Sequence, residues 1–391
     1  MSRVAFARIA GALAGVALLG AAQAQDAPQE PFEPAPLTVD DARSALDHAL
    51  AWLVASQRED GAWGSAVCDS FQFGDVFSVE TYYAWQVAAS GLACLALLTA
   101  DETPERRAAL DRGLAWLCEG RAPKRGSDWD VDYVWSGLYG TVALVEAADD
   151  PRFAGDEDQA RLAAGAARYL DILVRNQAPA GGWGYYDDPI YSRRPQWATS
   201  FCTALVLPAL KRSLERGWLD DPAVLARAQR YVARCAVPEG AYEYSLNPVA
   251  RINGGEHINR VRGSLGRTQV CNWGLREVGE KKITPERVRE GLDAFFEHHA
   301  YLDVARLRPI PHEAYYQNAG YFYLFGHAYA AYAINALPAD EREPWHAKLR
   351  AHLVKVQHAD GSAFDFHDMA TMTAAGTAYL ALALALGMPE A

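Results

Sequence analysis

Residues 57–63 read QREDGAW, residues 177–183 read QAPAGGW, and residues 357–363 read QHADGSA. Each copy places a glutamine four residues before a glycine, and the first two copies end on a tryptophan. A charged stretch with helical spacing precedes each copy, and an apolar stretch rich in alanine follows it. A recurring helix pair of this kind cannot bury its own apolar face, so it stacks on its neighbours. The repeat therefore predicts an architecture of stacked helical hairpins.

Six such pairs can be followed along the chain. The first helix of each pair is charged on one side and apolar on the other, as a half-exposed helix is, whereas the second is apolar almost all round. The predicted outer helices span residues 41–56, 104–119, 157–176, 221–235, 285–299 and 341–357. The predicted inner helices span residues 79–100, 132–148, 195–215, 266–279, 315–337 and 369–387. Twelve alternating helices predict an all-α fold, an (α/α)6 toroid of six helical hairpins arranged as a double ring.

The N-terminal segment has the pattern of an export signal. Two arginines, an apolar run over residues 9–19 and a small-x-small site at residues 22–24 follow one another in the order of a signal peptide. We therefore expect a signal peptide over residues 1–24, a Pro-rich leader over residues 25–40 and the toroid over residues 41–391. The protein is expected to be exported, either periplasmic or secreted. The apolar run is shorter than the roughly 18 residues that a span needs, so no transmembrane span is predicted.

The net charge limits the classes of ligand, and the positions of the cysteines limit the possible disulfides. The chain has 49 acidic and 37 basic residues, for a net charge of −12, which argues against nucleic acid as a ligand. Cysteines in an exported chain permit disulfides. Cys94, Cys202 and Cys271 lie on apolar helix faces and are expected to be core thiols. The cysteines nearer helix ends, which are the candidates for disulfides of undefined pairing, are Cys68, Cys118 and Cys235.

The glutamine, glycine and tryptophan phrases resemble the repeats of squalene and oxidosqualene cyclases and of protein prenyltransferase β subunits. The resemblance covers most of the chain after the signal peptide and implies the α/α toroid. Prenyltransferases hold zinc through an Asp-x-Cys pair and a distant histidine. Thioester domains that share the ring need Cys-Gly-x-Gln. Neither motif occurs in this chain, so no metal and no cofactor are predicted.

The catalytic motif of squalene cyclases is partly matched in this chain. Squalene cyclases protonate an alkene with an aspartic acid of an Asp-x-Asp-Asp motif at the rim of an inner helix. Residues 128–132 read DWDVD, so Asp130 and Asp132 match the spacing of the first two aspartates, and the tandem pair is missing. Two interpretations of these aspartates stay open, and they predict pKa shifts in opposite directions. A catalytic carboxyl has a raised pKa, whereas an aspartate that caps the helix has a lowered pKa.

A polar cluster suggests a different chemistry, in which arginine neutralises an acid while histidine or tyrosine moves a proton beside a carboxylate. The candidate catalytic residues of this kind are His257, Arg260, His312 and Tyr316. Exported toroids that cleave uronic-acid polysaccharides resemble this combination. The candidate ligand-binding residues, which are rim aromatics and further arginines, are Trp85, Trp135, Trp197, Arg262, Arg267 and Tyr321. The alternative is that the arginines pair with acidic loop residues and that His312 caps a helix.

The first functional interpretation is an exported toroid, similar to prenyltransferases and terpene cyclases, that binds a hydrophobic or ring-shaped ligand in its central cavity without an intact family catalytic motif. The second is a polysaccharide lyase or hydrolase that acts on an acidic glycan. The third is a non-enzymatic scaffold that binds another protein. The expected partner is a lipid-like or carbohydrate small ligand, and the sequence leaves open whether the chain is an enzyme.

Overall fold

The computed structural model describes residues 37–69, 77–124, 131–185, 195–246 and 257–389, which form helices and no β-strand. The outer helices are α2 (Val39–Ser56), α4 (Pro104–Glu119), α6 (Asp156–Asn176), α8 (Pro222–Cys235), α10 (Pro285–Glu297) and α13 (Ala339–Val356). The inner helices are α3 (Val79–Thr99), α5 (Val134–Asp149), α7 (Ser200–Glu215), α9 (Leu265–Glu277), α12 (Phe322–Asn335) and α14 (Ala370–Leu386). The connections hold α11 (Ala300–Ala305) and the 3₁₀ turns η1 (Pro151–Phe153), η2 (Val261–Gly263) and η3 (Tyr315–Gln317).

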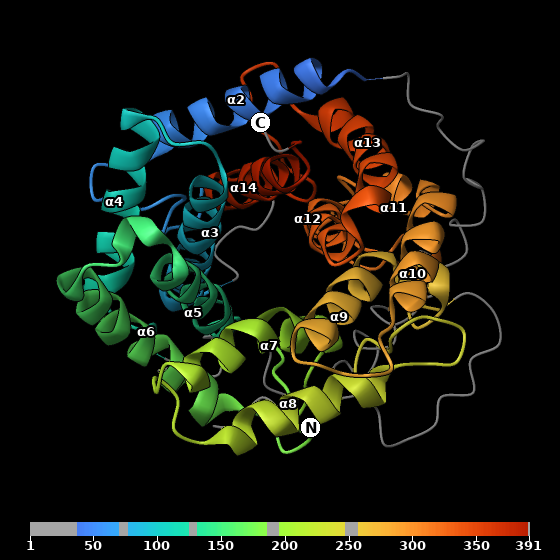
Figure 1. Cartoon of the computed structure of the whole chain (residues 1–391), viewed down its shortest axis with the longest axis horizontal. Helices are drawn as coiled ribbons and strands as arrows, with labels where there is room; N and C mark the ends of the chain where they lie inside the picture. The colour runs from blue at the N-terminus through green and yellow to red at the C-terminus, as the bar shows by residue number, and fades with distance from the viewer. Residues whose placement is uncertain (1–36, 70–76, 125–130, 186–194, 247–256, 390–391) are drawn as a thin grey trace, which may run out of the picture.

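The inner helices form a closed ring. Each packs against the next in chain order, and α14 packs against α3 to complete the circle (Figure 1). The outer helices surround this ring, and α2 contacts both α13 and α14 where the last hairpin meets the first. The expected α/α toroid of six hairpins is confirmed.

Three outer helices begin with the same pair of residue types. A Thr or Asp accepts a hydrogen bond from the first helical turn, and a proline follows it as the first helical residue. Proline suits this position because an N–H there would have no acceptor within the helix, and because the fixed φ of proline is already helical. The pairs are Thr103-Pro104, Asp221-Pro222 and Thr284-Pro285. These signals explain why the predicted starts lie within one residue of the observed ones.

The repeated glutamine ties neighbouring outer helices together. The Gln57 side chain donates to the carbonyl of Gly61 at 2.9 Å and to the carbonyl of Ala109 in α4 at 2.8 Å. Gly61 has a φ of 94°, and a Cβ on it would lie 2.6 Å from the Arg112 carbonyl oxygen. Only glycine fits such a left-handed turn against a neighbouring backbone. The glutamine and glycine of the repeat therefore build the joint between successive hairpins.

The repeat tryptophans anchor this joint in the core. Trp63 and Trp183 are fully buried. The Trp63 indole N–H donates to the Leu53 carbonyl at 2.7 Å, and the Trp183 indole donates to the Leu173 carbonyl at 2.8 Å. Both rings therefore combine a large buried apolar area with a satisfied polar group, as buried tryptophans require.

The third copy of the repeat closes the ring. The Gln357 side chain donates to Gly361 O at 3.0 Å and to Ala45 O, in α2, at 2.9 Å. Ala363 occupies the position of the tryptophan, and its N–H donates to the Thr377 hydroxyl at 2.9 Å. The same hydrogen-bonding pattern thus joins the last outer helix to the first.

The structure corrects the predicted start of the fifth inner helix, which lies at Phe322 and not at residue 315. Tyr316 and Gln317 have φ values of 53° and 55°, outside the right-handed helical region. The Asn318 side chain donates to the carbonyls of Arg262 and Tyr315. Such side-chain bonds to the backbone compete with helix formation. Residues 315–317 therefore form only a 3₁₀ turn.

The structure also bears on the expected disulfides and on the expected absence of a transmembrane span. Cys118 and Cys235 are buried thiols and not disulfide partners. Helix α3 is long and apolar enough to cross a membrane by length and composition, but 89% of that apolar window is buried inside the ring. Such burial is what the core helix of a toroid requires.

Candidate functional site

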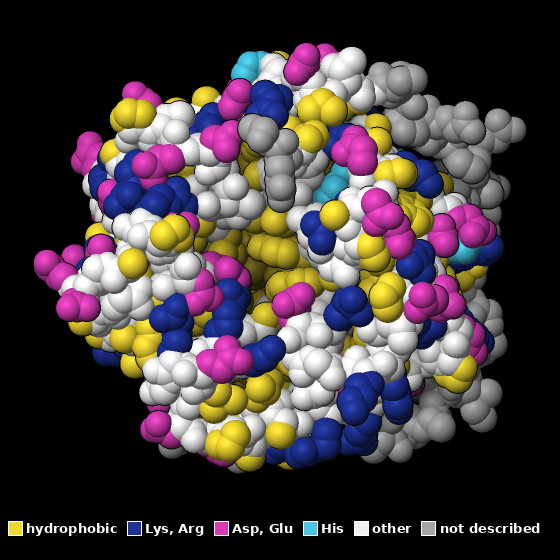
Figure 2. All heavy atoms as spheres, in the orientation of Figure 1, with side chains coloured by type: hydrophobic (Ala, Val, Ile, Leu, Met, Phe, Trp, Pro, Cys, Tyr) yellow, Lys and Arg dark blue, Asp and Glu magenta, His cyan; other side chains and the backbone are white. Residues whose placement is uncertain are grey.

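A cavity of about 280 Å³ lies inside the ring of inner helices. Its wall is built from α3, α5, α7, α12 and α14 and from the loops that precede these helices. Because the inner helices begin at the same end of the ring, residues that are distant in sequence converge there. The aromatic lining residues are Phe77, Trp85, Trp135, Tyr139, Tyr185, Phe201, Tyr321, Phe322, Phe325, Phe366 and Tyr379. Figure 2 shows the centre of the ring hollowed and lined with hydrophobic side chains, with charged side chains around the rim.

Asp132 enters this cavity from the loop before α5. Its φ of 64° is unusual for a residue with a side chain. Its N–H donates to the Tyr185 carbonyl at 2.8 Å, and its carbonyl accepts from the Trp135 N–H at 3.0 Å. The N-cap of α5 is Tyr133, which makes no side-chain cap. Asp132 is therefore held by its backbone, and its carboxyl does not cap the helix.

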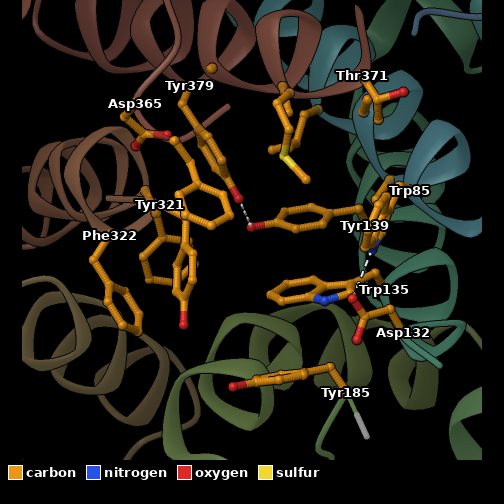
Figure 3. Close-up of a pocket in the computed structure, with 18 of the residues that line it drawn as sticks. Trp85, Asp132, Trp135, Tyr139, Tyr185, Tyr321, Phe322, Asp365, Thr371 and Tyr379 are labelled. Carbon is orange, nitrogen blue, oxygen red and sulfur yellow. Dashed lines mark hydrogen bonds between the residues drawn. The ribbon is translucent and has the colours of Figure 1, made fainter. Parts of the chain in front are cut away.

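The Asp132 carboxyl is buried and sparsely bonded. Only 7% of the residue is exposed. The Trp85 indole N–H donates to Oδ2 at 3.0 Å, and Oδ1 has no hydrogen-bond partner among the described residues (Figure 3). Burial raises the pKa of Asp132 to about 7, against the opposing effect of the Trp85 hydrogen bond. The pKa is raised, as expected for a carboxyl that retains its proton, and not lowered, as expected for a carboxylate that caps a helix. Asp130 lies outside the described residues.

Asp365 is a second carboxyl on the cavity wall, and sequence reasoning missed it. One of its oxygens accepts from the Leu324 N–H, in the first turn of α12, at 2.7 Å. Burial raises its pKa to about 7 although this amide favours the carboxylate. Figure 3 shows Asp132 and Asp365 on opposite sides of the cavity. A signal did exist, because Asp365 follows Gln357 by eight residues, as Tyr185 follows Gln177, and both line the cavity.

Aromatic faces fill the space between the two acids. Trp135 and Tyr139 stack with their ring centroids 6.0 Å apart and their planes inclined by 7°. The Tyr139 hydroxyl is hydrogen-bonded to the hydroxyls of Tyr379 and Tyr329. The Tyr139 and Tyr379 hydroxyls are therefore bonded to each other, and both residues line the cavity. The faces of aromatic rings attract a positive charge.

Four other predicted residues also line the cavity, namely Trp85, Trp135, His312 and Tyr321. His312 does not cap a helix. Its Nδ1 lies 2.7 Å from the Gln317 carbonyl, so the ring carries its proton there. Its Nε2 therefore accepts from the Tyr321 hydroxyl at 3.0 Å. Burial lowers the pKa of His312, which keeps the ring neutral near pH 7.

Arg260 and Arg262 do not join His312 at the cavity, whereas Arg267 lies near His312 and against the ring of the cavity residue Phe322. Arg260 is exposed at the surface and does not line the cavity. The Arg262 guanidinium lies over the rings of Tyr301 and Tyr316 and donates to the Tyr316 hydroxyl at 2.9 Å. Arg267 is buried, 5.2 Å from the Tyr244 ring, and donates to the Ile258 carbonyl. The three candidate arginines therefore do not line the cavity, and neither Arg262 nor Arg267 pairs with an acid among the described residues.

The remaining candidates lie outside the cavity lining. His257 is half-buried, and its Nδ1 accepts from the Asn259 N–H at 3.1 Å. Tyr316 contacts Arg262, as described above. Trp197 packs edge-on against the cavity residue Tyr185, with ring centroids 5.3 Å apart, and so supports the wall from behind.

Residues 35–137 match the family model of the squalene-hopene cyclase C-terminal domain. This match includes the first repeat and Asp132. It agrees with the closed double ring that the structure shows. The chain has the α/α toroid of the terpenoid cyclase and prenyltransferase-like superfamily. No curated protein matches the sequence significantly.

Solved structures share the toroid at low identity. A variant of the type II terpene cyclase MstE from Scytonema, in complex with geranylgeranyl dihydroxybenzoate as substrate, is 15% identical, with a TM-score of 0.51 over 90% of this chain and 99% of that one. A possible GH105 family member from Klebsiella pneumoniae is 16% identical, with a TM-score of 0.54 over 93% and 96%. The GH76 α-mannanase from Bacteroides thetaiotaomicron is 10% identical, with a TM-score of 0.55 over 88% and 96%. At these identities the likeness concerns the fold.

Proposed function

We propose that the toroid binds an alkene-bearing isoprenoid lipid in its central cavity and that Asp132 donates a proton to it. The observation that carries this proposal is the Asp132 carboxyl, which is buried, raised in pKa to about 7 and unbonded at Oδ1 among the described residues. A general acid works best with a pKa near the working pH. The cavity volume of about 280 Å³ is just below the roughly 300–1,000 Å³ of small-molecule pockets, so it suits a small lipid or one end of a longer one.

The chemistry follows from the groups around the acid. The proton on Oδ1 moves to one alkene carbon, a C–H bond forms, and positive charge develops on the neighbouring carbon. The Trp85 N–H stabilises the carboxylate that is left on Asp132. Trp135 and Tyr139 present ring faces to the cation. Loss of a proton from an adjacent carbon to the carboxylate or to water then restores the neutral product and the charge balance.

A deuterium-transfer experiment tests this proposal. The protein is incubated in D₂O with a panel of isoprenoid alcohols and hydrocarbons of increasing length, and the products are analysed by mass spectrometry. Wild type should place one deuterium per molecule, and Asp132→Asn should transfer at least about a hundredfold more slowly, because general acids contribute that much or more. Asp368→Asn, an exposed acid near the start of α14, is the matched control and should behave as wild type. Equal rates for the two variants would refute the assignment of Asp132.

A glycan hydrolase is the second candidate, and Asp365 is the observation that favours it. Glycoside hydrolysis uses two carboxyl groups, one on each side of the scissile bond, and the cavity holds two on opposite sides. Asp365→Asn separates the two candidates. A hydrolase needs both acids, whereas proton transfer from Asp132 to a lipid persists without Asp365. If the chain turns over neither substrate class, the interpretation as a protein-binding scaffold is favoured.

We also propose that the protein is exported, on the pattern of residues 1–24. Expression in a Gram-negative host followed by intact-mass analysis tests this. A periplasmic product that begins at Gln25 supports cleavage, and a cytoplasmic product that retains residues 1–24 contradicts it.

A further inference from the structure

Three buried histidines meet behind the cavity wall, in the last third of the chain. His299 lies at the start of α11, His327 in α12 and His352 in α13, and each is at most 5% exposed. One nitrogen of each ring lies within 4.8 Å of the others. Sequence spacing gives no warning of this cluster, because its members come from three different helices.

The outward-facing nitrogens fix the protons on two of these rings. His327 Nδ1 lies 2.7 Å from the Tyr323 carbonyl, which only accepts hydrogen bonds, so Nδ1 carries a proton. His299 Nδ1 lies 3.0 Å from an Asp303 carboxylate oxygen and is protonated for the same reason. The two Nε2 atoms lie 3.0 Å apart. When both rings are neutral, the lone pairs of the two Nε2 atoms therefore point into the space between them. This contact is repulsive unless a cation lies between the two nitrogens.

We propose that His299, His327 and His352 bind one zinc ion through their ring nitrogens. Nitrogens that share a tetrahedral zinc at about 2.0–2.1 Å lie about 3.3 Å apart, close to the His299–His327 separation. The His352 ring lies against the His299 ring, with centroids 3.6 Å apart, and its ligand nitrogen lies within 4.8 Å of the other two. The fourth position goes to a non-protein ligand such as water. Three imidazoles suit zinc and other late transition metals better than Mg²⁺ or Ca²⁺, which prefer oxygen.

The surroundings supply the second layer of such a site. Asp303 accepts from His299 Nδ1, which is the carboxylate–histidine–metal arrangement that orients ligating histidines. Lys355 lies 3.8 Å from the other Asp303 oxygen and helps to hold this carboxylate in place. The ion joins α11, α12 and α13, so its effect is to stabilise the wall of the ring. The proposal does not depend on the chemistry of the cavity.

Metal analysis of the full chain, purified without a histidine tag, tests the site. The protein is stripped with chelator, reconstituted with ZnCl₂ and dialysed, and zinc is counted by inductively coupled plasma mass spectrometry. We expect one zinc per chain and a higher melting temperature than that of the stripped protein. Co²⁺ in place of zinc should give the visible absorption bands of a four-coordinate site. Zinc at background level with no cobalt spectrum would overturn the proposal and would leave a shared proton between His299 and His327 as the cation.

Variants locate the ion. His327→Gln and His352→Gln should each lose the bound zinc, and Asp303→Asn should weaken zinc binding by about 10- to 100-fold. His346→Gln is the matched control, because His346 is also a buried histidine of α13 but bonds to Asn335 at 2.8 Å, outside the cluster. It should keep one zinc. Circular dichroism of the stripped proteins verifies folding, and unchanged stoichiometry in the folded His327 variant would contradict the site.

Discussion

The proton on Asp132 couples the stability of the protein to pH. Burial raises the pKa of this carboxyl from 3.8 to about 7, so between these values the folded protein holds a proton that the unfolded chain has released. Raising the pH through this window destabilises the wild type, because the folded state binds more protons. Asp132→Asn removes this dependence. Relative to wild type, its free energy of unfolding should rise by about 1–4 kcal/mol between pH 4 and pH 8. Urea unfolding at both values measures this, and a difference independent of pH would contradict it.

Trp85 sets how tightly Asp132 holds its proton. Its indole N–H bonds to the carboxylate at 3.0 Å and lowers the pKa of Asp132 against the effect of burial. Trp85→Phe removes that donor, so the pKa of Asp132 should rise above about 7, because the lost hydrogen bond favours the charged carboxylate. The infrared band of the protonated carboxyl, assigned by its loss in Asp132→Asn, follows the titration. A midpoint below that of wild type would show that Trp85 does not stabilise the carboxylate.

Within the helices, the sequence was most informative where local chemistry sets the boundary. The Thr-Pro and Asp-Pro pairs mark the starts of α4, α8 and α10, and the glutamine repeat marks the turns. It failed at α12, where the Asn318 side chain bonds to a backbone carbonyl in a distant segment. Asp365 was missed because its only signal is its spacing from Gln357 in a degenerate copy of the repeat.

The repeat tryptophans should dominate the stability of their hairpins. Trp63 is fully buried and bonds to Leu53, so Trp63→Ala should cost about 3–5 kcal/mol, as the loss of large core aromatics does. Trp52, in the preceding helix, is only partly buried, and Trp52→Ala serves as the control with less than half that cost. Denaturant unfolding compares the two variants. Equal losses would show that the repeat position has no special role.

Gln357 joins the last outer helix of the ring to the first. Gln357→Leu leaves the carbonyls of Gly361 and Ala45 without their donor, which should cost about 1–3 kcal/mol. Gln57→Leu removes the equivalent hydrogen bonds between two hairpins that are consecutive in the chain, and it is the matched control. Hydrogen exchange should increase across α13 and α2 in the first variant and across α2 and α4 in the second. Identical exchange maps would contradict a separate closing joint.

The covalent order of the hairpins is therefore separable from the ring that they build. Helix α2 packs on α13 and α14, the last two helices of the ring (Figure 1). A circular permutant can join residue 389 to residue 37 through a flexible linker and open between Lys281 and Lys282, which are exposed in the turn before α10. Every hairpin then keeps its neighbours, so we expect the same helix content and a cooperative melt. A permutant that unfolds without cooperativity would show that the ring needs its native starting point.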